Sequence, residues 1–192
     1  MKAYVINLDK RPDRMKLFLE NKIPFKVERY SGLVRAKGED GCTDSHMDIL
    51  SKQTEFPFII FEDDCWIIED WEIVEKAMTQ LPSNWDALWL GANLRIRLPR
   101  YSENLYWLRR AYCTHAIIYG SKRMVDFVLE KKEALAKGQN FDIFYCKDVQ
   151  RRFNCFITYP MVATQRSDYS DIAKVETNNA QYLLQEYKKM IR

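Results

Sequence analysis

Short apolar runs alternate with amphipathic segments along the first half of the chain. Runs such as FIIF at 58–61 and DALWLG at 86–91 predict buried strands, because unbroken apolar residues suit the middle of a sheet covered on both faces. Between these runs, apolar residues recur at helical spacing, and Pro12 marks a first helical turn. The predicted strands are 2–8, 25–30, 58–61 and 86–91, and the predicted helices are 9–22, 40–53 and 70–81.

The second half of the chain continues the mixture of strands and helices. Residues 93–120 predict two or three strands with a basic, proline-containing connection, and 155–160 predicts one more. Helices are expected at 121–136, at 142–152 and from about 174, and a polar loop is expected at 163–171.

This alternation predicts an α/β fold with a Rossmann-like, mostly parallel central sheet flanked by helices. No internal repeat, low-complexity tract or linker divides residues 1–192, so a single domain is expected. Ligands of such sheets bind beyond the carboxyl ends of the strands. Candidate chemistry is therefore sought at the residues that follow each strand.

The composition narrows the class of protein. Hydrophobic residues make up 47% and charged residues 30%, as in ordinary globular proteins, and the net charge of +3 does not indicate a nucleic-acid partner. The five cysteines form no CxxC pair, so neither a disulfide framework nor a zinc site is expected. No apolar run is long enough for a signal peptide or a membrane span, and we expect a cytoplasmic protein.

Three adjacent carboxylates, Glu62, Asp63 and Asp64, follow the apolar strand at 58–61. We call these three residues the acidic step. Hard oxygen ligands at a strand end suit Mn²⁺ or Mg²⁺, and such an ion binds a substrate diphosphate. The alternative is that one aspartate caps a following helix while the other acids face solvent.

Polar residues also follow the first strand and enter the second helix. Asn7, Arg11 and Arg14 fall at the same predicted sheet edge, where the arginines can address a base or a phosphate. A solvated helix start is the alternative for this segment. Ser45 and His46 lie on the helix at 40–53, and a lone histidine is more often structural than a ligand.

The acidic step, the residues after the first strand and several other blocks of the sequence together resemble glycosyltransferase family 25. This family includes lipopolysaccharide-type and collagen galactosyltransferases. The order and spacing of the blocks match over most of the chain. The matching blocks are YVINLDKRPDRMKLF, GCTDSH, FIIFEDDCWI, THAIIYGSKRM, FDIF and SDYSDI.

The resemblance implies a GT-A fold, a UDP-sugar donor (typically UDP-galactose), a divalent metal and inversion at the anomeric carbon. It implies that Asp64 is a direct metal ligand, with Glu62 or Asp63 assisting through water or the ribose. We therefore expect Glu62 and Asp64 at Mn²⁺ or Mg²⁺, and Asp63 at the nucleotide sugar. The remaining residues expected at the nucleotide sugar are Asn7, Leu8, Arg11, Arg14, Ser45 and His46.

Inverting transfer to a hydroxyl of a glycan or glycoprotein acceptor needs a general base. Asp142 is the candidate, although the chain reads FDIF where the family usually has Pro-Val-Asp. An N-cap of the helix at 142–152 is the alternative role for Asp142. Arg166, Ser170 and Asp171 are candidates to close over the diphosphate.

Two rival functions use the same residues. A metal-dependent nuclease or nucleotidyltransferase needs further acids at matched strand ends, where the first strand supplies only Asp9. A non-catalytic nucleotide-sugar-binding domain would keep the fold without turnover. The sequence favours the transferase because it retains the acidic step together with Asp142.

Overall fold

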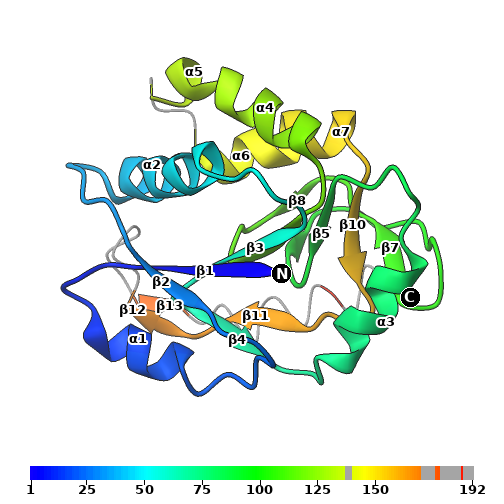
Figure 1. Ribbon diagram of the computed structural model, residues 1–192, viewed down its shortest axis with the longest axis horizontal. Helices are drawn as coiled ribbons and strands as arrows, with labels where there is room; N and C mark the ends of the chain where they lie inside the picture. The colour runs from blue at the N-terminus through cyan, green and yellow to red at the C-terminus, as the bar shows by residue number, and fades with distance from the viewer. Residues whose placement is uncertain (137–139, 170–175, 178–186, 188–192) are drawn as a thin grey trace.

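A mixed sheet forms the centre of the computed structural model, which describes residues 1–136, 140–169, 176–177 and 187 (Figure 1). Five of its seven strands run in one direction, while β7 and β9 are antiparallel to their neighbours. In spatial order the strands are β2 (Glu28–Ser31), β1 (Lys2–Asn7), β3 (Phe58–Glu62), β9 (Ala116–Tyr119), β5 (Ala87–Trp89), β10 (Cys155–Thr158) and β7 (Leu105–Trp107). The predicted α/β fold with a mostly parallel, Rossmann-like sheet is confirmed.

Helices cover both faces of this sheet (Figure 1). One face carries α2 (Gly38–Ser51), α4 (Lys122–Glu130), α5 (Lys132–Ala136), α6 (Phe141–Phe144), the π-helical turn η1 (Tyr145–Val149) and α7 (Gln150–Arg152). The other face carries α1 (Pro12–Phe18) and α3 (Glu72–Gln80).

The first four residues of strand β3, Phe58 to Phe61, are all apolar because both faces of the sheet are covered there. Phe58 and Ile60 belong to the core beneath α2 and α4, whereas Ile59 and Phe61 belong to the core beneath α1 and α3. All four side chains are fully buried. Because successive side chains point to opposite faces, a strand covered on both sides has no polar position.

Three short antiparallel pairs lie outside the main sheet. They are β4 (Cys65–Ile67) with β11 (Ala163–Gln165), β6 (Asn93–Leu94) with β8 (Ala111–Tyr112), and β12 (Asp168–Tyr169) with β13 (Glu176–Thr177). The loop predicted at 163–171 is therefore wrong at its beginning, because β4 offers the backbone of β11 a partner, and again at Asp168–Tyr169, which form β12. This pairing places Gln165 opposite Cys65, next to the acidic step.

Several predicted boundaries are also corrected. The helix predicted from 9 to 22 spans only Pro12–Phe18, and residues 93–120 contain four strands rather than two or three. The helix predicted from about 174 is wrong at its start, since Glu176–Thr177 form β13. Most of that segment lies outside the described residues, as do Ser170 and Asp171.

The parallel strands β1 and β3 are neighbours, so their carboxyl ends meet at one edge of the sheet. Ile6 pairs with Glu62 in this register, which brings Asn7 to the start of the acidic step. Among the described residues, no helix combines the length and the apolar character that crossing a membrane needs.

Candidate functional site

Asp63 is held on both of its carboxylate oxygens. Asn7 at the end of β1 donates from Nδ2 to Asp63 Oδ2 at 2.8 Å, and Arg14 of α1 donates from Nη1 to Oδ1 at 2.8 Å. Burial raises the pKa of Asp63 above its ordinary value, although Arg14 and Asn7 oppose this rise. With both oxygens engaged, Asp63 acts here as an anchor for β1 and α1.

Asp64 is the least satisfied acid of the step. Its Oδ2 accepts a 3.2 Å hydrogen bond from Gln165 Nε2 and lies 3.5 Å from Arg14 Nη2. Its Oδ1 is buried without a hydrogen-bond partner among the described residues. Burial, followed by the charge of Glu62, raises the pKa of Asp64 to about 8. This carboxyl group therefore has a free oxygen and lacks a sufficient counter-charge.

Glu62 is tied to two side chains through a single oxygen. Glu62 Oε1 lies 3.2 Å from His46 Nε2 and accepts a 2.6 Å hydrogen bond from the Thr114 hydroxyl. Burial alone would raise the pKa of Glu62, but the hydrogen bonds from His46 and Thr114 more than offset it. The pKa of Glu62 accordingly lies below its ordinary value.

Thr114 connects Glu62 to Asp142. Its Oγ1 is 3.2 Å from Asp142 Oδ1 as well as 2.6 Å from Glu62 Oε1. A hydroxyl group has one proton, so Thr114 donates to only one carboxylate at a time. When the Thr114 hydroxyl donates its hydrogen bond to Glu62, a protonated Asp142 can in turn donate a hydrogen bond to the Thr114 oxygen. Burial, followed by the charge of Glu62, raises the pKa of Asp142 to about 6.

The alternative role of Asp142 as an N-cap is wrong. Asn140 caps α6, and its Oδ1 accepts from the backbone N–H groups of Asp142 at 2.9 Å and of Ile143 at 3.4 Å. Because Asn140 satisfies these first-turn donors, the Asp142 carboxylate is left to face Thr114.

The other predicted residues form two groups: Ser45 and Arg14 line the cavity described next, and Arg11 does not. Ser45 is buried, accepts from the backbone N–H of Leu33 at 2.8 Å and donates to the carbonyl of Gly41 at 2.6 Å, so it fixes the entry into α2. Arg11 turns its guanidinium to Asp13, with Nη2 2.8 Å from Asp13 Oδ2. The structure thus brings Arg14 to the acidic step, whereas Arg11 is not among the residues that line the cavity described next.

A cavity of about 570 Å³ opens beside the acidic step. Its volume is within the range of pockets that hold small-molecule ligands. Three kinds of side chain line it: apolar, basic and acidic. The apolar group includes Ile6, Leu8, Leu33 and Val34, the basic group is Lys10, Arg14, Arg35 and Lys37, and the acidic group is Glu39, Glu62, Asp63 and Asp64. Cys42 and Ser45 also line the cavity.

Thr114, Gln165 and Cys42 are site residues that the sequence did not single out. Thr114 begins the last strand predicted within 93–120, but its contact with Glu62 depends on β9 pairing antiparallel with β3. Gln165 reaches Asp64 only through the pairing of β11 with β4. Cys42 precedes His46 by four residues, which is the one local signal that places them on the same helical face.

No protein-family model and no curated protein sequence matches the chain. Among solved structures, a mannose-1-phosphate geranyltransferase from Thermus thermophilus is 10% identical with a TM-score of 0.42, covering 81% of this chain. The chain spans 58% of the length of that structure. A197 from STIV is 14% identical with a TM-score of 0.48, and the match covers 93% of this chain and 95% of A197. Both likenesses are distant, and neither bears on the chemistry of the site.

Proposed function

We propose that this protein is a divalent-cation-dependent, inverting glycosyltransferase. It would move a hexose, most readily galactose, from a UDP-sugar to a hydroxyl group of a glycan or glycoprotein. One observation carries the proposal: Asp64, with a free buried oxygen, borders a cavity that also holds basic and apolar side chains. The resemblance of the sequence blocks to glycosyltransferase family 25 supports the choice of donor.

The three acids of the acidic step differ in how well they can serve as ligands of a hard cation. Asp64 fits Mn²⁺ or Mg²⁺, because its Oδ1 is unpartnered and its raised pKa reflects a missing positive charge. Asp63 does not fit, because Asn7 and Arg14 occupy both of its oxygens. Glu62 would assist through its second oxygen, since Oε1 is engaged by His46 and Thr114. A bound cation would neutralise charge on the departing diphosphate.

The cavity supplies the other groups that a sugar nucleotide needs. Lys10, Arg14 and Lys37 provide positive charge for a diphosphate. Ile6, Leu8 and other apolar lining residues provide a surface for a base. Ser45 shapes this wall through its hydrogen bonds to Leu33 and Gly41.

Asp142 would act as the general base. Its pKa of about 6 leaves it mostly ionised at neutral pH yet close enough to accept a proton effectively. In the proposed reaction an acceptor hydroxyl loses its proton to Asp142 while its oxygen forms a bond to the anomeric carbon. The bond from that carbon to the diphosphate oxygen breaks, and UDP leaves with the electron pair. The Thr114 hydroxyl would hold the ionised Asp142 carboxylate by donating its proton to Asp142 in place of Glu62.

The direct test is release of UDP from a panel of UDP-hexoses with Mn²⁺, with and without sugar acceptors, followed by chromatography. Wild-type protein should release UDP, whereas Asp64→Asn and Asp142→Asn should be strongly impaired. Asp13→Asn is the matched control, because Asp13 is exposed and pairs with Arg11 outside the cavity.

The rivals give different results in the same series. Binding of a UDP-sugar without any turnover would identify a non-catalytic binding domain. Mg²⁺-dependent cleavage of nucleic acid, or incorporation of nucleotides, would identify the nuclease or nucleotidyltransferase instead.

A further inference from the structure

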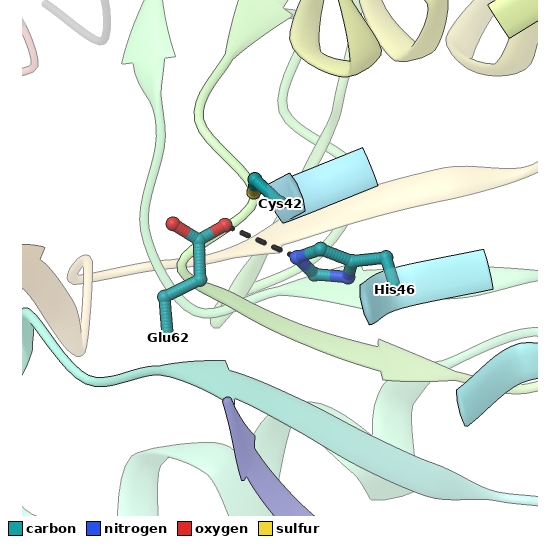
Figure 2. A group of neighbouring side chains, drawn as sticks. All are labelled: Cys42, His46 and Glu62. Atoms are coloured by element: carbon teal, nitrogen blue, oxygen red, sulfur yellow. Dashed lines mark hydrogen bonds and ion pairs between the residues drawn. The ribbon is translucent and has the colours of Figure 1, made fainter. Parts of the chain in front are cut away.

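Three donor atoms of different chemical types converge at the end of β3. The Cys42 thiol, an imidazole nitrogen of His46 and a carboxylate oxygen of Glu62 all lie within 4.8 Å of one another. Cys42 and His46 are four residues apart on α2, so they face the same side of that helix. Figure 2 shows both side chains projecting from α2 toward the Glu62 carboxylate.

His46 makes its hydrogen-bond contact within this group, while its ring packs against Phe141 with ring centroids 5.0 Å apart. The ring is fully buried, and its Nδ1 has no hydrogen-bond partner among the described residues. Its Nε2 lies 3.2 Å from Glu62 Oε1 (Figure 2). Burial, followed by the charges of Glu62 and Asp142, raises the pKa of the Cys42 thiol, so the sulfur keeps its proton until a metal ion displaces it.

We propose that Cys42, His46 and Glu62 form a site for a zinc-class transition-metal ion with one open coordination position toward the cavity. Sulfur and imidazole ligands favour Zn²⁺ over Mg²⁺ or Mn²⁺, which prefer oxygen. Three protein ligands with a free fourth position are the arrangement of open zinc sites. Cys42 and Glu62 line the cavity, so a water molecule or an anionic oxygen of a ligand can fill that position.

The spacing of the donors requires only a small adjustment. Ligands around a tetrahedral zinc ion are separated by roughly 3.3 to 3.7 Å, given zinc–ligand distances of about 2.0 to 2.3 Å. The His46–Glu62 pair is already 3.2 Å apart, and no donor pair exceeds 4.8 Å. Movement of side chains by about 1 Å would therefore close the site. On binding, Cys42 gives up its thiol proton to solvent, and the thiolate bonds the metal.

This site is separate in chemistry from the proposed cation at Asp64 and does not depend on the transferase proposal. Asp64 is not part of the cluster, whereas Glu62 could serve either ion. Cys42 and His46 are therefore the diagnostic residues. All measurements are made without nucleotide, so a failure of zinc binding and a failure of the transferase proposal are distinguishable.

The test is a titration of metal-free, full-length protein with Co²⁺ and then with Zn²⁺ against a chromophoric chelator. We expect one ion per chain, a sulfur-to-cobalt charge-transfer band, and no displacement by excess Mg²⁺. Cys42→Ser should abolish the band. Cys42→Ser and His46→Gln should each weaken Zn²⁺ binding by more than the roughly 10- to 100-fold that loss of an outer-shell partner costs.

Two control variants isolate the cluster. Cys146→Ser changes a buried cysteine that lies outside the cluster, and Asp64→Asn changes the neighbouring carboxyl; both should retain the charge-transfer band. Absence of stoichiometric binding, or an unchanged band in Cys42→Ser, would overturn the site. Either result would show that Cys42 does not bind a metal together with His46 and Glu62. The contact between His46 and Glu62 would then be a structural hydrogen bond only.

A second measurement on wild-type protein avoids any folding defect of the variants. X-ray absorption at the zinc edge should show one sulfur ligand together with nitrogen and oxygen ligands. A shell containing only nitrogen and oxygen would overturn the assignment of Cys42.

Discussion

Arg14 is joined to Asp63 by a 2.8 Å ion pair in which both side chains are largely buried. The pair fastens α1, which follows β1, to the turn that follows β3. The same guanidinium reaches Asp64 at 3.5 Å. Burial, followed by the charge of Glu62, outweighs the attraction of this guanidinium and raises the pKa of Asp64 to about 8.

Replacing Arg14 should therefore weaken the fold and make it depend on added cations. We expect Arg14→Ala to lower the free energy of unfolding by about 3 to 5 kcal/mol, as when one partner of a buried ion pair is lost. Urea denaturation measures the loss, and Mn²⁺ should restore part of it. Lys76→Ala, in the exposed pair with Glu72, is the control and should leave the free energy of unfolding almost unchanged. A loss below about 1 kcal/mol in Arg14→Ala would contradict the role of this pair.

Asn7 must remain an amide if it is to donate to Asp63. Its side chain is 1% exposed, and Nδ2 also donates to the carbonyl of Arg11 at 2.9 Å. Asn7→Asp would remove both donors and set a second carboxylate against Asp63, which should cost at least about 2 kcal/mol of unfolding free energy. Asn84→Asp at an exposed position is the control. Equal effects of the two substitutions would exclude a special role for Asn7.

The proposed base predicts a particular pH profile. If Asp142 must be ionised, kcat/KM should fall about tenfold per pH unit below its pKa of about 6. Thr114 helps to hold the pKa of Asp142 down, so Thr114→Val should move the acid limb to higher pH. Asp142→Asn should lower turnover by about 10²- to 10⁴-fold. An acid limb that does not move in Thr114→Val would argue against Asp142 as the base.

His115 should make the fold sensitive to acid. Burial lowers the pKa of its imidazole to about 4, so the folded protein keeps it neutral where the unfolded chain protonates it. Its stabilising contribution is present above about pH 6.5 and is lost as pH falls toward 4, by roughly 3 kcal/mol in all. Urea denaturation between pH 4 and pH 7 measures this slope. His115→Gln should flatten the slope even if its absolute stability is lower, and an unchanged slope would rule out His115 as its source.

The layered architecture could be predicted because burial on both faces leaves a plain mark in the sequence. Phe58 to Phe61 are apolar without a break, and all four are buried in the structure. The direction of β9 left no such mark, since Ala116–Tyr119 are buried whether the strand runs parallel or antiparallel. That direction places Thr114 against Glu62, so the link to Asp142 could not be foreseen.

The acidic step was predicted, but the partners of its acids were not. Asp63 and Asp64 are equivalent in the sequence, whereas only Asp63 has both oxygens satisfied. The local sequence also did not show that Asn140, rather than Asp142, caps α6. The two residues are only two positions apart, and both types of side chain can accept from first-turn N–H groups. The expectation of no zinc site rested on the absence of CxxC spacing. The donors of the proposed cluster, from α2 and β3, meet only after folding and therefore leave no such signature.

The cavity beside Asp64 should bind a sugar nucleotide only when a divalent cation is present. Titration calorimetry with UDP, UDP-galactose and UDP-glucose, each with and without Mn²⁺, measures this directly for wild type, Asp64→Asn and the control Asp13→Asn. We predict one Mn²⁺-dependent site per chain, weakened at least about 10-fold in Asp64→Asn and unchanged in Asp13→Asn. Folded wild-type protein that binds none of the three nucleotides, with or without Mn²⁺, would contradict the proposed function.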